Sequence, residues 1–187
     1  MKNILKNRLA LSTVVTTLII LVVSVLLAGV VTYFAINVTS TRVQEENLSL
    51  SKQHVWVEMD GTAVSAIMIT NTGGRDVVLG KIACRGQAAD LTTQAWYVVA
   101  GSSDTLTTDL NYTAGATIDA TAIFGGLAGA PAQPTQDSLV LTSGSTMVIY
   151  IESPDSINVN DIGLTVAITV FTSQAIHYKE TNVEAAL

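Results

Sequence analysis

The sequence predicts an α+β protein in which one long N-terminal hydrophobic helix precedes an all-β domain of the sandwich or barrel type. No charged residue occurs from Leu9 to Thr41, a run of 33 residues, and all fifteen acidic residues follow position 42. Beyond that point, short runs of alternating apolar and polar residues are separated by turn-forming residues, as is typical of sandwiches. We therefore divide the chain into three parts: a basic leader (1–10), a hydrophobic helix (11–47) and an external β-domain (48–187).

The charge distribution sets the orientation of the helix. An apolar segment of roughly 20 residues already spans a bilayer, and this one is longer than the h-region of a conventional cleaved signal peptide. Lys2, Lys6 and Arg8 precede it, and the acidic residues follow it. The positive-inside rule then places the N-terminus in the cytoplasm and the β-domain outside the cell.

Small and hydroxylated residues recur along this helix. Ser24, Ala28 and Thr32 are spaced four residues apart, and Gly29 lies next to them. Small residues at this spacing let two helices approach closely, and Ser and Thr can bond to their own backbone. The sequence therefore predicts helix–helix packing at these four residues, although an ordinary single membrane anchor tolerates the same pattern.

The external half reads as a series of strands that form an immunoglobulin-like sandwich or barrel. The Asn71–Gly74 segment is a strong turn signal, so we expect residues 64–84 to form a hairpin. Further strands are expected at 91–99, 138–142 and 145–152, at 164–171 as a central strand, and at 175–183 as an edge strand. Residues 113–136 are rich in Ala, Gly and Thr, which predicts a surface loop or a segment that orders against a neighbouring subunit.

Composition excludes several classes of function. Charged residues make up only 13% of the chain against 49% hydrophobic residues, so the chain is not intrinsically disordered. The net charge of −6 argues against a nucleic-acid partner, because phosphate binding needs basic patches. Cys84 is the only cysteine, which excludes an intramolecular disulfide. Neither His54 nor His177 lies near a nucleophile motif, so we expect no enzyme and no cofactor.

Two kinds of modification or ligand site remain. N-glycosylation sequons begin at Asn37, Asn47 and Asn111, and all three lie on the predicted external side. An oxygen-rich loop contains Asp155, Asn158, Asn160 and Asp161. Such a loop is a candidate for calcium, although turns rich in Asx residues are far commoner than metal sites.

Taken together, these features resemble an archaeal type IV pilin precursor. The N-terminal match consists of the basic leader, the junction Leu9-Ala10-Leu11-Ser12 and the apolar run Val14–Ile36. In the external half, Ile69–Val78 and the stretch from Ser143 to Val170 are similar to the β-domains of archaeal pilins and archaellins. Thr13 stands where many members carry proline, and the glutamate near the mature N-terminus of bacterial pilins has no counterpart.

The resemblance implies a structural subunit of an extracellular adhesion filament. A prepilin peptidase would remove the leader between Ala10 and Leu11, and an assembly ATPase with its membrane platform would extract the subunit. The helices would polymerise into a homopolymer core, and the β-domains would form its outer surface. Two alternatives stay open, namely an archaellin of a motility filament and a single-pass surface binding protein that does not polymerise.

Overall fold

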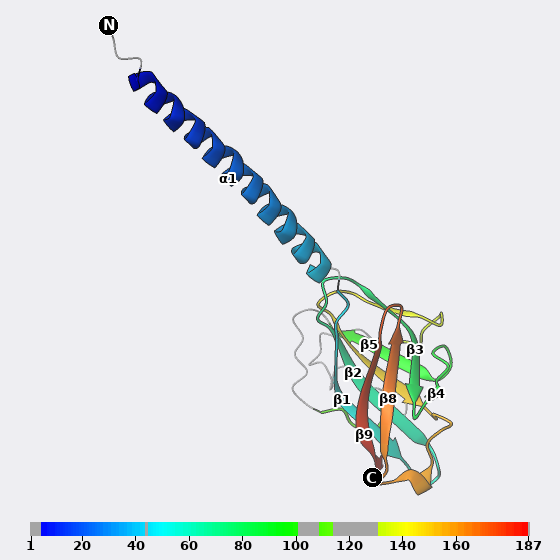
Figure 1. Cartoon of the computed structure of the whole chain (residues 1–187). Coiled ribbons are helices and arrows are strands. Elements are labelled where there is room, and N and C mark those ends of the chain that lie inside the picture. Colours follow the sequence, from blue (N-terminus) through cyan, green and yellow to red (C-terminus); the bar gives the residue numbers. More distant parts are fainter. Residues whose placement is uncertain (1–4, 44, 101–108, 114–130, 187) are drawn as a thin grey trace. The chain divides into compact units, whose positions relative to one another are not determined.

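The computed structural model describes residues 5–43, 45–100, 109–113 and 131–186. The chain divides into two compact units, Met1–Val43 and Gln44–Leu187. The described residues of the first unit form a single helix, and the second unit contains all the strands of the described residues (Figure 1).

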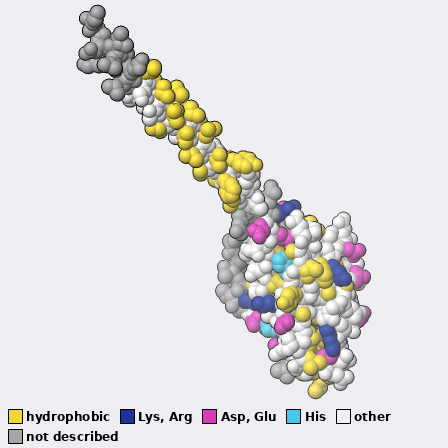
Figure 2. Space-filling model, in the orientation of Figure 1, with side chains coloured by type: hydrophobic (Ala, Val, Ile, Leu, Met, Phe, Trp, Pro, Cys, Tyr) yellow, Lys and Arg dark blue, Asp and Glu magenta, His cyan; other side chains and the backbone are white. Residues whose placement is uncertain are grey.

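The helix α1 (Leu5–Val43) is 39 residues long and has no polar face. Its side chains from Leu11 to Thr41 are exposed, and no charge interrupts the hydrophobic surface that Figure 2 shows along it. These 31 residues extend about 46 Å at about 1.5 Å per residue, more than the roughly 30 Å of a bilayer's hydrocarbon core. The helix is therefore long and apolar enough for a membrane anchor or a signal sequence.

The helix ends at Val43, four residues before the predicted boundary at residue 47. The Asn47 carbonyl oxygen accepts hydrogen bonds from the backbone N–H of Thr72 at 2.9 Å and of Gly73 at 3.1 Å. The Thr72 hydroxyl donates a third bond to the same oxygen at 3.2 Å. Because the Asn47 carbonyl is bonded within the second unit, it does not accept the i to i+4 backbone hydrogen bond of a continuing helix.

The second unit is built on one mixed sheet. Across the sheet the order is β4-β3-β8-β9-β1-β2-β7-β5, with β6 beside β3. Every pairing is antiparallel except that of β1 with β9, which is parallel. The strands are β1 (Leu48–Val57), β2 (Ala63–Asn71), β3 (Val77–Cys84), β4 (Gln87–Ala88), β5 (Ala95–Ala100), β6 (Leu139–Leu141), β7 (Thr146–Glu152), β8 (Thr165–Thr172) and β9 (Ile176–Ala185).

The sheet curls so that both of its halves contribute to one hydrophobic core. Ile67 of β2 and Ile149 of β7 come from one half, whereas Leu79 of β3 and Ile168 of β8 come from the other. All four side chains are at most 1% exposed. The predicted α+β class is therefore confirmed as one long helix followed by a curled mixed sheet.

The predicted hairpin over residues 64–84 is wrong. Both strands form, but β2 pairs with β1 and β7, whereas β3 pairs with β4, β6 and β8. The turn at Asn71 is instead a corner between the two halves of the sheet. Its buried amide Nδ2 donates to the carbonyls of Arg75 at 2.8 Å and Leu141 at 3.1 Å, and its Oδ1 accepts from Gly73 N at 3.0 Å. These bonds direct the chain away from β2, so β2 and β3 do not pair as a hairpin.

The expected edge strand at 175–183 is also wrong, because β9 lies inside the sheet between β8 and β1 (Figure 1). Its pairing with β1 covers only Val183–Ala185. Upstream of this pairing, β1 shifts its register between Ser51 and His54, and Lys52 adopts a positive φ of 49°. The parallel pairing therefore does not extend along β9. The charged residues of β9 are typical of an edge strand, and they led to the sequence prediction.

The remaining strands follow the sequence more closely. The central strand expected at 164–171 is confirmed as β8, which lies between β3 and β9. The strand expected from Leu91 begins only at Ala95, because Asp90 organises a turn. Asp90 Oδ1 accepts hydrogen bonds from the backbone N–H and the hydroxyl of Thr92 at 2.9 and 2.7 Å.

Most of the predicted loop at 113–136 lies outside the described residues, which resume at Pro131. The first part that follows runs beside β5. Tyr97 and Ala132 exchange backbone hydrogen bonds in both directions, at 2.9 and 3.1 Å. This bridge covers part of the free side of β5.

We expect Asn71→Ala to lower the free energy of unfolding of a fragment comprising residues 45–187 by about 2–4 kcal/mol. The change removes three side-chain hydrogen bonds and leaves buried backbone groups unsatisfied, each at a cost of about 1–3 kcal/mol. Urea unfolding followed by circular dichroism measures the loss. Asn182→Ala is the matched control, because Asn182 is exposed and accepts one hydrogen bond from Thr165. Equal losses in the two variants would contradict the corner assignment.

Candidate functional site

The residues predicted for helix packing are all exposed on α1. Ser24, Ala28 and Thr32 follow one another at four-residue spacing, and a Cβ added to Gly29 would meet nothing within 4 Å. The Ser24 hydroxyl donates to Leu21 O at 2.8 Å, and the Thr32 hydroxyl donates to Ala28 O at 2.7 Å. Because these hydroxyls are satisfied within the helix, this face can meet an apolar neighbour without leaving a polar group unpaired.

The predicted cleavage junction between Ala10 and Leu11 lies within α1, which runs from Leu5 through it without a break. The Leu11 side chain is 67% exposed.

The three sequons occupy different settings. Asn37 lies within the apolar part of α1, and its carbonyl accepts the hydroxyls of Ser40 and Thr41 at 3.1 and 2.9 Å. Asn47 directly precedes β1, with its carbonyl bonded at the 72–73 corner. Asn111 lies outside every described strand, and its side chain is exposed.

The Asn111 sequon belongs to a short segment, residues 109–113, which covers the outer face of β1, β2, β7 and β5. Trp56, Val148 and Tyr150 form a second apolar cluster on that face. Leu110 packs into this cluster with 3% exposure, and the Tyr112 ring meets Trp56 edge-on at 6.3 Å between ring centroids. The segment thus forms the cover of a second, smaller core.

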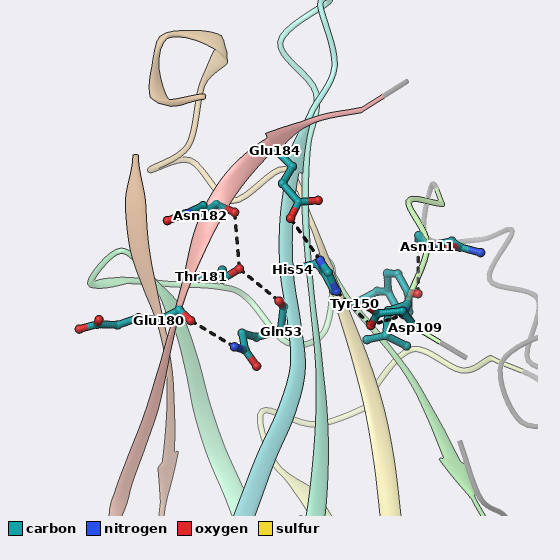
Figure 3. A network of polar contacts seen from close by, with 10 residues as sticks. Gln53, His54, Asp109, Asn111, Tyr150, Glu180, Thr181, Asn182 and Glu184 are labelled. Atoms are coloured by element: carbon teal, nitrogen blue, oxygen red, sulfur yellow. Dashed lines mark hydrogen bonds and ion pairs between the residues drawn. The ribbon is translucent and has the colours of Figure 1, made fainter. Parts of the chain in front are cut away.

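A polar contact fixes one end of this covering segment to the sheet (Figure 3). His54 Nε2 lies 3.0 Å from Asp109 Oδ1, and His54 Nδ1 lies 3.6 Å from Glu184 Oε1. The imidazole stacks on Trp56 at 5.0 Å between ring centroids, with 6° between the planes. His54 therefore joins β1, β9 and the covering segment at the point where β1 and β9 begin to pair.

The ionisation of two residues reflects this arrangement. Desolvation opposes the charged form of Asp109, but hydrogen bonds from His54 and Leu110 N–H outweigh it and lower the pKa of Asp109 below its ordinary value. Burial raises the pKa of Tyr150 to about 12. The Tyr150 hydroxyl therefore stays protonated near neutral pH, and it donates to Asn111 O at 3.1 Å.

Side chains bridge β1 and β9 just beyond the end of their backbone pairing. Gln53 Nε2 donates to Glu180 O at 3.2 Å, and the Thr181 hydroxyl donates to Gln53 O at 3.1 Å. Figure 3 shows these contacts between the two neighbouring strands. They satisfy backbone carbonyls that the register shift within β1 leaves without a strand partner.

The loop considered for calcium is held by protein contacts. Asn158 caps the short 3-10 helix η2 (Val159–Asp161), and Asp161 Oδ2 accepts from Asn158 N at 2.9 Å. The largely buried Asp161 carboxylate also accepts a hydrogen bond from Arg85 at 2.8 Å. Among the described residues, no group of three or more His, Cys, Asp or Glu side chains is placed to hold a metal ion.

Burial also decides the chemistry of Cys84. Desolvation raises the pKa of its thiol to about 11, so the thiol remains protonated near neutral pH. A protonated, fully buried thiol is a small apolar side chain and a poor nucleophile.

Sequence reasoning missed the contact between His54, Asp109 and Glu184, and the role of Asn71. The first joins residues that are 55 and 130 positions apart, and no local period connects them. The second had a signal, because an asparagine between a strand and two glycines favours a turn. The pattern predicted the turn but not which strands it joins.

Comparisons with known proteins identify no family. No family profile matches the chain, and no curated protein matches it. Among solved structures, it is similar to the Pseudomonas fluorescens alkylpurine DNA glycosylase AlkC, with a TM-score of 0.28 and 10% identity over 74% of this chain. It is also similar to a Listeria innocua beta-glucosidase, with a TM-score of 0.27 and 12% identity over 76% of this chain. The chain spans only 30% and 16% of those two proteins, and scores this low carry no argument about fold or function.

We expect Asp109→Asn to destabilise the second unit by about 0.2–1 kcal/mol at pH 7, because it weakens a hydrogen bond to a carboxylate that is 64% exposed. The pKa of Asp109 is lowered on folding. Its contribution is therefore complete above the ordinary value of about 3.8 and is lost as the pH falls through the lower folded pKa. Urea unfolding at pH 7 and pH 3 should show the difference from wild type shrinking in acid.

Asp137→Asn is the control for this measurement, because Asp137 is exposed and the described residues give it no hydrogen bond or ion pair. A loss for Asp137→Asn as large as that for Asp109→Asn would indicate a general charge effect. It would contradict a specific role for the contact with His54.

Proposed function

We propose that this chain is a structural subunit of an extracellular type IV pilus-like filament that serves adhesion. The observation that carries the proposal is a continuous helix whose exposed surface is apolar on every side, joined to a unit with a core of its own. Such a helix is stable in a bilayer and again in a bundle of identical helices, but not in water.

The small residues of α1 support close packing between subunits. Ser24, Ala28 and Thr32 leave little side-chain volume on one face, and the two hydroxyls already bond to the helix backbone. Neighbouring helices can then approach closely through van der Waals contact. A contact of this kind that is repeated head to tail, without closing into a ring, generates a helical filament.

Processing and assembly would proceed as in the archaeal pilin precursors that the chain resembles. A prepilin peptidase would cut between Ala10 and Leu11 and remove the cations Lys2, Lys6 and Arg8. An assembly ATPase and its membrane platform would then move the helix from the bilayer into the filament core. The cell-surface location proposed here depends on this step.

The β-domain would form the outer surface of the filament. From residue 48 onward it carries thirteen acidic and five basic residues, and like charges disfavour uncontrolled association of such domains. We also propose that the curled sheet is a variant of the immunoglobulin-like sandwich, because residues from both of its halves form one shared core.

A single-pass surface protein that does not polymerise is the second candidate, since the same helix would serve as its anchor. An archaellin is a further variant of the filament proposal. The row of small residues favours polymerisation, because small side chains allow another helix to approach closely, and an isolated anchor in lipid has no such neighbour.

We expect Ala28→Asp to abolish filaments, because it places an unpaired charge in an apolar environment at a cost of about 2.5–3.5 kcal/mol near a membrane centre. Electron microscopy of sheared filaments, with the subunit identified by mass spectrometry, measures the yield. Normal filaments would contradict the placement of Ala28 in the core.

Ala28→Leu separates polymerisation from anchoring. Leucine keeps the helix apolar, so the chain stays in the membrane fraction, but it adds volume at the proposed close contact. Val30→Leu is the matched control on the opposite side of α1. We expect filament loss only in Ala28→Leu. Equal filament yield in both variants would contradict a close helix contact at Ala28, whereas the absence of filaments from the wild type as well would favour the non-polymerising anchor.

A fragment of residues 45–187 should be soluble, monomeric and rich in β-structure, because its core takes no side chain from α1. Light scattering together with circular dichroism checks this. Filaments formed by this fragment would replace helix packing with strand exchange as the mechanism of assembly.

A further inference from the structure

We propose that Asn111 is the acceptor of an N-linked glycan, and that Asn37 and Asn47 are not. A sequon must satisfy two physical conditions to be used. The transferase must reach it outside the membrane, and the folded protein must then have room for the sugar. The chain offers three sequons in three settings, so each one can be tested against both conditions.

Asn37 and Asn47 fail the first condition. Asn37 lies within the apolar span Leu11–Thr41, only four residues before its end, so the membrane restricts the approach of an enzyme that acts at the exterior. Asn47 follows Thr41 by six residues, which reach at most about 20 Å even when fully extended. The membrane surface therefore crowds this sequon while the chain is being processed. Asn111 is seventy residues beyond the end of the span, so the chain length does not restrict its distance from the membrane.

The second condition is met by the side chains of both Asn47 and Asn111, which are exposed. The Asn47 backbone is packed at the corner, where a Cβ added to Gly73 would lie only 2.9 Å from Asn47 N, so the first condition is the one that separates the two sequons. The Asn111 side chain is exposed, and it points away from Tyr150 and the strands in Figure 3. The described residues give its amide no hydrogen-bond partner, so a sugar there displaces no hydrogen bond to them.

The backbone beneath Asn111 is nevertheless firmly held. Tyr150 donates to the Asn111 carbonyl, Leu110 is buried on one side, and Tyr112 packs against Trp56 on the other. The glycan would thus be attached at a fixed point over the second apolar cluster. The Thr113 hydroxyl, which a sequon requires, is buried in the folded chain, so transfer takes place before the covering segment docks.

The transfer itself needs a lipid-linked oligosaccharide as co-substrate, with its first sugar carried on a polyprenyl phosphate. A bond forms between Asn111 Nδ2 and the anomeric carbon of that sugar. The bond between this carbon and the phosphate oxygen breaks, and the carrier leaves with the electron pair. One proton passes from Nδ2 to a base of the transferase, and nothing is oxidised or reduced.

The test uses the full chain isolated from the cells that produce it, with intact-mass and peptide mass spectrometry. Wild type, Asn37→Gln, Asn47→Gln and Thr113→Ser should carry a sugar mass on the peptide that contains Asn111. Asn111→Gln should lose the entire increment. It should fold normally, because the described residues give the Asn111 amide no hydrogen-bond partner. Urea unfolding of Asn111→Gln, compared with enzymatically deglycosylated wild type, checks the fold.

An unmodified Asn111 peptide in the wild type would overturn the proposal, as would a sugar increment that persists in Asn111→Gln. Sugar on Asn37 or Asn47 would contradict the inference that the membrane keeps the transferase from these two residues. None of these outcomes depends on filament formation, because glycan occupancy is read from the subunit itself.

Discussion

The constraint on which the rest of the molecule depends is that α1 has no polar face. From Leu11 to Thr41 its side chains are mostly apolar, hydroxyls such as those of Thr16 and Thr32 bond to the helix backbone, and all of these side chains are exposed. A surface of this kind must be covered by lipid or by other apolar helices, because the hydrophobic effect penalises its exposure to water. A helix that is reserved for such a partner contributes nothing to a soluble core. The chain therefore needs a second unit that is stable by itself, and every residue of both apolar clusters comes from position 48 or later.

The second unit reaches that stability by folding one sheet onto itself, and polar side chains direct the two places where the chain departs from regular pairing. At the first, the buried Asn71 satisfies two carbonyls and one N–H, so the chain can leave β2 and enter the opposite half. At the second, β1 loses its register near Lys52, and Gln53 and Thr181 bridge to β9 with side-chain bonds. At both places side-chain hydrogen bonds to the backbone replace part of the regular ladder, so the sheet can curl while these backbone groups stay bonded.

These two places also mark the limit of what the sequence can predict. The helix was predictable because thirty-three uncharged residues are a local signal that needs no partner. The existence of most strands was predictable from alternation, and β8 was placed correctly inside the sheet. Pairing was not predictable, because Asn71-Thr72-Gly73-Gly74 has the composition of a hairpin turn, and the carbonyl that redirects it belongs to Leu141, seventy residues away. The charges of β9 favoured an edge strand. Its last three residues instead pair with β1 in parallel, and the alternation of apolar and polar residues does not predict which strand is the partner.

The same reasoning explains how the candidate site was partly visible in the sequence. The sequon at Asn111 is a local motif and was found, whereas its setting depends on His54 and Tyr150, which come from β1 and β7. Within the segment, Asp109 bonds to His54, Leu110 is buried, Asn111 faces out and Tyr112 packs against Trp56. Among the described residues, the contacts that hold this segment to the sheet are all made by side chains. Asn111 takes part in that attachment only through its backbone carbonyl, and the described residues give its side chain no hydrogen bond, so this side chain can be modified or substituted without weakening the core beneath it.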